Sequence, residues 1–392
     1  MEQLTENSSS RVQIAIIGAL LLVAVGLLGV WLYLRPVDTN VDRISVLDAP
    51  IDGFDYQPDA SAAELLKLAD VTLDDLSSRF PDVPQTFNVI ANRDFLVSDT
   101  GAAKSNWTKA VELEPSNTEA LFGLANVAFE DTRYEDAIGI CETIDRLAPN
   151  NPKVPLLLAD ALLHAGKADE AALVLEQHLA TEQGSVQAIE LLGNAHLQTK
   201  SYEKAAQCFQ RAIDFAPKSK DAHYGLAQAF ARLGDRDNAK RFMERFKNIA
   251  KEIGDEHAEE AKAFEDRNYA AHVAAQVYVD SANIFRAQGD IATACNYILR
   301  AHRLQPDVEP WLTELQRMFF SNGQLDEAAD VGEHLVGLAP QDLERRLNLA
   351  SLYADLGRAD DAIENYEAAI ELAPDDPRCQ QAKQIINQLN AS

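Results

Sequence analysis

Hydrophobic residues recur through most of the chain with the spacing of short amphipathic helices. Between residues 84 and 374, segments with apolar residues three and four positions apart alternate with short polar turns. Prolines close these segments at an interval of 34 residues, and each marks a helix end because proline cannot continue a helix. They are Pro81, Pro115 and Pro149, then Pro217 after a missed position, and later Pro306, Pro340 and Pro374.

Small residues recur at the same interval. An alanine lies twelve positions before each mark, and a glycine often lies in the preceding turn. We therefore expect each unit to hold two helices that cross closely at the alanine. The alanines are Ala103, Ala137, Ala171, Ala205, Ala239, Ala294, Ala328 and Ala362, and the glycines are Gly166, Gly234, Gly289, Gly323 and Gly357.

This pattern resembles the tetratricopeptide repeat (TPR) family from about Pro84 to Pro374. The clearest unit reads Leu192-Gly193, Tyr202, Ala205, Phe209, Ala212 and Pro217. The resemblance implies an all-α, right-handed superhelical solenoid of about eight TPR helix-turn-helix repeats. Two positions depart from the family pattern: Asp94 replaces an aromatic residue in the first unit, and Gln316 replaces a small residue in the seventh.

One interval is too long. Pro217 and Pro306 are 89 residues apart, which leaves 21 residues beyond two periods. The excess predicts a helical insertion over 252–274, and we expect a helix from about 256 to 288 whose early part is exposed or docked on a partner. Repeats 1–5 then occupy 84–251 and repeats 6–8 occupy 275–376. Helices at 61–83 and 377–392 would cap the array, since exposed solenoid ends need capping.

The amino-terminal region has a different character. Residues 14–34 form an uncharged apolar run that is long enough for a transmembrane helix, with Trp31 and Tyr33 at one end. A cleaved signal peptide is the alternative, but its apolar region is normally shorter. We expect a tail over 1–13, a single-pass membrane anchor over 14–34 and an acidic tether over 35–60. The bulk of the chain would be extracytoplasmic.

Charge and motifs narrow the function. The formal net charge of -27 argues against nucleic-acid binding, which needs a basic surface. No phosphate-binding loop, nucleophile elbow or paired-histidine zinc motif occurs, and the four cysteines form no C-x-x-C motif. Residues 255–260 hold several acidic side chains and His257, which a solvated helix end explains better than a metal site. We expect no enzymatic activity, no cofactor, no metal and no small-molecule substrate.

The candidate site is a groove along the first helices of the units, which line the concave face in the family. The ninth residue of successive units forms a ladder of mostly short amides, suited to hydrogen bonding with an extended peptide backbone. Apolar residues at the fifth and twelfth positions lie beside it. The ladder is Asn92, Asn126, Asp160, Asn194, Gln228 and Asn283, and the apolar wall includes Phe122, Leu156 and Tyr224 with Phe129 and Leu163.

Each element of this groove has a structural alternative. Asparagine at the ninth position can serve local hydrogen bonding, and some of the apolar residues can pack between units. The fifth positions hold no basic residue, which argues against the carboxylate clamp of chaperone-binding TPR proteins. We expect a membrane-anchored TPR scaffold or adaptor that binds protein or extended peptide segments. The alternative is an accessory structural subunit in assembly of an envelope or secretion complex.

Overall fold

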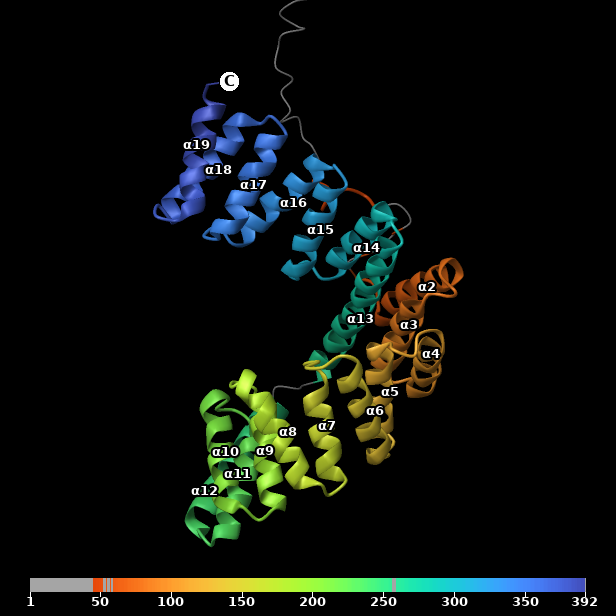
Figure 1. The fold of residues 1–392 in the computed structure, drawn as a ribbon, viewed down its shortest axis with the longest axis vertical. Coiled ribbons are helices and arrows are strands. Elements are labelled where there is room, and N and C mark those ends of the chain that lie inside the picture. The colour runs from red at the N-terminus through yellow and green to blue at the C-terminus, as the bar shows by residue number, and fades with distance from the viewer. Residues whose placement is uncertain (1–44, 52–53, 55–56, 58, 256–258, 392) are drawn as a thin grey trace, which may run out of the picture. The chain divides into compact units, whose positions relative to one another are not determined.

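Helical hairpins form most of the chain. The structure is a computed structural model that describes residues 45–51, 54, 57, 59–255 and 259–391. These residues contain 18 helices, α2 to α19, and no strand (Figure 1). The chain divides into two parts, Met1–Ala49 and Pro50–Ser392. In the first part, residues 45–49 form a turn in which the backbone N–H of Asp48 donates to the carbonyl of Ser45.

The second part, Pro50–Ser392, is an all-helical, TPR-like solenoid. Helix α2 (Ala62–Arg79) precedes eight helix pairs, and α19 (Pro377–Leu389) follows them. The pairs are α3 (Pro84–Leu96) and α4 (Thr100–Leu113), α5 (Thr118–Glu130) and α6 (Tyr134–Leu147), α7 (Val154–His164) and α8 (Ala168–Thr181), α9 (Val186–Gln198) and α10 (Tyr202–Phe215), α11 (Lys220–Leu233) and α12 (Arg236–Asp255), α13 (Glu259–Ala287) and α14 (Ile291–Leu304), α15 (Glu309–Ser321) and α16 (Leu325–Leu338), and α17 (Leu343–Asp355) and α18 (Ala359–Leu372).

Local sequence sets where many first helices begin. Asn117, Ser185 and Ser219 precede α5, α9 and α11, and each side chain accepts a hydrogen bond from a backbone N–H in the first turn. Such caps satisfy N–H groups that have no partner within the helix. In these three units a capping side chain therefore fixes where the first helix begins.

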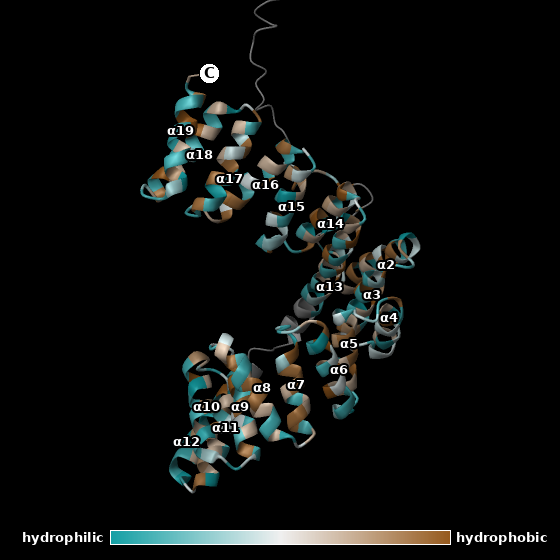
Figure 2. Cartoon of the chain, in the orientation of Figure 1, coloured by the Kyte–Doolittle hydropathy of each residue, from teal (hydrophilic) through white to brown (hydrophobic). Residues whose placement is uncertain are grey.

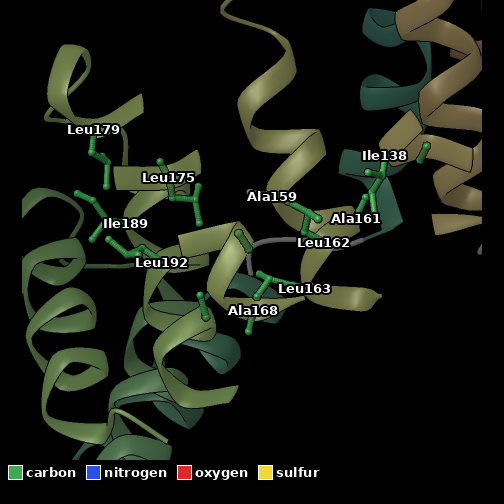
Figure 3. Packing of buried hydrophobic residues seen from close by; sticks show 14 of the residues in the cluster. Ile138, Ala159, Ala161, Leu162, Leu163, Ala168, Leu175, Leu179, Ile189 and Leu192 are labelled. Carbon is green, nitrogen blue, oxygen red and sulfur yellow. The ribbon is translucent and has the colours of Figure 1, made fainter. Parts of the chain in front are cut away.

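The core consists of large residues packed against small ones. The crossing alanines Ala205 and Ala362 are completely buried. Phe209 of α10 lies so close to α11 that a Cβ added to Gly225 would lie 2.4 Å from its ring. Figure 3 shows the aliphatic part of the core, where Leu175 and Leu179 lie near Ile189 and Leu192. Large side chains from second helices thus fill the space beside small residues of first helices.

The long helix α13 covers part of the predicted insertion over 252–274. It packs mainly against α14 and α2, with a smaller contact with α3. The expected exposure of the early part of the helix, before Tyr269, falls mostly on residues 253–265, whose side chains are not described, and burial begins with Ala270, Ala271 and Val273. Residues 256–258 lie outside the described part of the chain.

Helix α2 packs against α13 and buries part of its surface. Leu65, Ala69, Leu73 and Leu76 lie along one face of α2 and are buried. Where α2 ends, the rings of Phe80 and Phe285 meet edge to face, with centroids 5.0 Å apart. The expected amino-terminal cap over 61–83 therefore forms a helix, but α2 packs more extensively on α13 than on α3.

Aromatic and polar contacts extend this junction beyond α2. The Phe54 ring lies edge-on to Tyr278 of α13, with centroids 5.9 Å apart. Arg267 donates from Nε to the carbonyl of Ala60 at 3.0 Å, and the hydroxyl of Tyr297 donates to Asp75 at 3.3 Å. The segment before the first repeat is therefore tied to the sixth helix pair.

The unusual Asp94 is a buried acid that has partners. Arg93 donates to one of its carboxylate oxygens at 2.9 Å, and the amide of Asn106 donates to the other at 3.0 Å. Arg93 also pairs with Asp70 of α2. A polar network thus replaces the aromatic contact that is usual at this position, and it joins α2 to α3.

No helix in the described part of the chain combines the length and apolar character needed to cross a membrane. Figure 2 shows that the helices carry both hydrophobic and hydrophilic residues. The predicted span over 14–34 lies outside the described residues, and the anchor stays a prediction.

Candidate functional site

The structure places the ladder residues on first helices and shows that the amides of two of them donate to nearby acceptors. The amide of Asn92 donates to Glu119 of α5 at 3.0 Å. The amide of Asn126 donates to the carbonyl of Phe122, one turn earlier in its own helix, at 2.9 Å. For these two residues the geometry favours local hydrogen bonding over ligand capture.

The other ladder positions differ in availability. Asp160 lies 3.3 Å from Nδ1 of His164, and burial raises the pKa of its carboxyl. Asn283 accepts a hydrogen bond from Arg286 at 3.1 Å. Asn194 is exposed and Gln228 is half-buried. Asn194 is therefore the amide of the ladder that is best placed to meet another molecule.

The predicted apolar wall is only partly a surface. Leu163 is 6% exposed and belongs to the core, so its assignment to an exposed wall is corrected. Phe122 and Leu156 are half-buried and pack against core clusters. The Phe129 ring meets the rings of Tyr134 and His164 edge to face. Tyr224 is 43% exposed beside Phe246 of α12, and it alone of these five is a largely exposed side chain.

The fifth, ninth and twelfth positions of the seventh unit and the ninth position of the eighth line a cavity that was not predicted from the sequence. The cavity lies between α15 and α17 and measures about 300 Å³. Thr313, Arg317 and Phe320 occupy the fifth, ninth and twelfth positions of the seventh unit, and Ser351 is the ninth residue of the eighth. The remaining lining residues are Gln316, Glu344, Asn348 and Leu352.

Charged residues continue from the ladder to this cavity. Arg317 contacts Glu314 at 3.0 Å, and Glu314 also pairs with Arg286, which in turn donates to Asn283. The side chain of Arg317 remains 69% exposed. Phe320 is 51% exposed at the same cavity. The ninth residues of units six and seven, Asn283 and Arg317, are thus linked through Arg286 and Glu314.

This arrangement provides the contacts that an extended peptide needs. The Arg317 guanidinium and the Asn348 amide can donate to backbone carbonyls or a carboxylate, and Asn348 and Ser351 can also accept. Phe320 offers apolar contact area beside these groups. The combination suits recognition of a protein segment.

Metal-binding clusters and thiol reactivity can be judged for the described residues. They contain no group of three or more His, Cys, Asp and Glu side chains arranged to hold a metal ion. Cys141 is buried, which raises the pKa of its thiol to about 12 and keeps it protonated at neutral pH. Of the acidic stretch over 255–260, residues 256–258 lie outside the described part of the chain.

Comparison with protein families identifies the repeats. Tetratricopeptide repeat profiles match residues 97–152, 128–195, 221–250 and 319–386, and a TPR repeat profile matches 193–234. The chain belongs to the tetratricopeptide repeat family.

Individual relatives are distant. Protein O-mannosyl-transferase TMTC1 from Homo sapiens is 22% identical over 51% of this chain and 21% of its own length. TPR repeat-containing protein YpiA from Bacillus subtilis (strain 168) is 25% identical over 34% of this chain and 31% of its own length. The match therefore spans less than a third of either relative.

Solved structures show similar repeats. MamA 41-end from Desulfovibrio magneticus RS-1 is 20% identical, covers 43% of this chain and 96% of its own, and has a TM-score of 0.41. YrrB, described as a TPR protein with an unusual peptide-binding site, is 19% identical, covers 45% and 91%, and has a TM-score of 0.40. Similarity at this level does not bear on function.

Proposed function

We propose that this protein is a TPR scaffold that binds an extended segment of a partner protein along the first helices of its repeats. The cavity between α15 and α17 is its main contact site. The observation that supports this most directly is the register of that cavity, because its lining includes the fifth, ninth and twelfth positions of one unit and the ninth of the next. Arg317 and Phe320 would supply the polar and the apolar anchor.

A peptide array probed with the full-length chain tests this proposal. Peptides that bind would then be measured against Phe320→Ala and Arg317→Ala, which should each weaken binding about tenfold, as is usual for anchors of an interface. Leu338→Ala is the matched control, because Leu338 is exposed on a second helix outside the cavity. Full binding by both groove variants would refute the assignment of this site.

We also propose that residues 14–34 anchor the scaffold in a membrane, with the bulk of the chain extracytoplasmic. The uninterrupted apolar run supports this. Sequencing the amino terminus of protein extracted from membranes should recover residues before position 14. A mature chain that begins after Leu34 would instead indicate a cleaved leader.

An accessory subunit that packs on folded partners is the second candidate. The observation in its favour is a set of exposed large hydrophobic residues on second helices: Leu113, Leu147, Leu173, Phe215 and Leu338. Such residues suit contact with a folded surface. In that case Leu173→Ser and Phe215→Ser would abolish capture of a partner that Phe320→Ala leaves intact.

A further inference from the structure

A second cavity lies where the sixth unit meets the first. It measures about 190 Å³ and is bounded by α3, α13 and Glu119 of α5. Asn88 and Gln85 line it from α3, Asp280 and Asn283 line it from α13, and Gln288 lies directly after the end of α13. Val89, Ile284 and Ala287 add apolar surface. The cavity depends on the packing of α13 against α3, which joins segments almost 200 residues apart in the sequence.

One wall of the cavity carries a buried acceptor that lacks a donor. Asn88 is 3% exposed, and its amide nitrogen donates to Asn117 at 3.1 Å and to Glu119 at 3.2 Å. Because both partners are acceptors, the orientation of the amide is fixed and its oxygen is the free end. Within the described part of the chain, this oxygen has no hydrogen-bond partner. A buried acceptor without a donor is costly and rarely left so.

Two carboxylates face the same space. Asp280 accepts a hydrogen bond from Gln276 at 2.9 Å, and Glu119 accepts from Asn88 and Asn92. Among the described residues, no lysine or arginine forms an ion pair with either carboxylate. Burial, with a smaller contribution from Glu119 opposed by Lys153, raises the pKa of Asp280 to about 6. The cavity thus gathers acceptor groups and negative charge without a matching cation.

We propose that this cavity binds the cationic side chain, arginine or lysine, of a partner protein. A guanidinium or an ammonium group is purely a donor, so it complements the Asn88 oxygen and both carboxylates together. The aliphatic stem of either side chain would pack on Val89, Ile284 and Ala287. The net charge of -27 favours the approach of a basic segment. The site is separate from the cavity between α15 and α17 and does not depend on the function proposed there.

Capped tripeptides provide a direct test with the full-length chain in detergent. The probes are acetyl-Ala-Arg-Ala-amide, its lysine counterpart, and a citrulline counterpart that keeps the shape of arginine without its charge. Binding would be followed by ligand-observed NMR titration. We expect the cationic probes to bind at least about tenfold more tightly than the citrulline probe, the difference typical of a charge-assisted pair. The arginine and lysine probes together show which cation fits better.

Two variants separate the site from general charge effects. Asp280→Asn keeps the shape of the side chain and should weaken binding of the arginine probe about tenfold. Glu367→Gln removes the same charge from the exposed surface of α18 and should leave binding unchanged. A melting curve for each variant confirms that it is folded. Equal binding of the arginine and citrulline probes, or equal losses in the two variants, would overturn the proposal whatever the groove variants Phe320→Ala and Arg317→Ala show.

Discussion

At the scale of single residues, the repeat conserves backbone shape more strictly than residue type. The turn between the two helices of every unit has one residue with positive φ. Glycine occupies it in five units, but Ser98, Thr132 and Lys200 adopt the same conformation at φ 64°, 60° and 60°. From the sequence, a left-handed turn could be predicted only in the five units that carry a glycine there. The other three turns could not be read from residue type, because packing of the two helices imposes the conformation.

Thr132 has the least suitable side chain of these three, since a β-branched residue is disfavoured at positive φ. We expect Thr132→Gly to stabilise the protein by about 1 kcal/mol, which is the strain released less the flexibility that glycine adds to the unfolded chain. Thermal unfolding of the two proteins measures this.

The reverse exchange in the next unit is the control. Gly166 has φ 78° and open space around its Cβ position, so Gly166→Thr tests backbone conformation without steric clash. It should destabilise the protein by a similar amount. If both substitutions leave the melting temperature unchanged, the left-handed turns carry no strain.

The residues of the candidate site were also only partly predictable from the sequence. The 34-residue register correctly placed Asn92 and Asn126 on first helices, but it could not show that Glu119 and the Phe122 carbonyl already bind their amides. Those bonds depend on rotamers and on neighbouring helices. The ladder also stopped at Asn283, because the next ninth positions are Arg317 and Ser351 and no longer form a series of amides. The cavity that the ninth positions line was therefore missed.

At the scale of helices, the seventh unit shows how a departure from the family pattern is accommodated. Its first helix carries Gln316 where other units carry alanine or glycine. Its second helix carries Gly332 where most other units carry large residues such as Trp107, Phe209 or Tyr366. A Cβ at Gly332 would lie 2.6 Å from Nε2 of Gln316. Large and small residues have exchanged places across the helix pair, so the pair keeps its packing.

This exchange predicts strong coupling between the two positions. Gly332→Leu should destabilise the protein by about 1–3 kcal/mol, because the leucine competes with Gln316 for the same space. Gln316→Ala in the same chain restores the arrangement of the other units and should recover most of that loss. Chemical denaturation of the two single variants and the double variant gives the coupling energy. Additive effects would show that the two side chains do not share this space.

At the scale of the whole solenoid, residues 50–392, packing is not limited to contacts between neighbouring repeats. The sequence predicted α2 as a cap and the long helix α13, and both helices exist. Nothing in the sequence indicated that α2 packs on α13, because each helix shows only a local hydrophobic pattern and five helix pairs lie between them in the chain. Phe54, Phe80 and Tyr297 contribute to that contact through aromatic and polar groups from three separate segments.

The junction predicts that damage in α2 is felt in α13. Leu76→Ala removes a completely buried side chain and should cost about 2–5 kcal/mol. Hydrogen exchange should then accelerate within residues 266–287 of α13. Leu175→Ala in α8 is the matched control, since Leu175 is equally buried but belongs to another core cluster. Equal acceleration of α13 in both variants would mean that α2 gives it no particular support.

Asp280 makes the junction between α3 and α13 sensitive to pH. Its folded pKa of about 6 lies above the ordinary value of 3.8, so the folded state binds its proton more tightly than the unfolded state. The groups around it are Glu119, which raises the pKa, and Gln276 and Lys153, which lower it. A raised carboxyl pKa favours folding below the unfolded value, and that contribution is lost as the pH rises through the folded value. The free energy of unfolding should therefore rise as the pH falls from 7 to 4, by at most about 3 kcal/mol from this group.

The Asp280→Asn variant cannot titrate at this position, so the difference in stability between it and the natural chain should change across this range and level off below pH 4. Chemical denaturation at a series of pH values measures that difference. A difference that stays constant from pH 7 to 4 would show that the carboxyl has an ordinary pKa and is open to solvent.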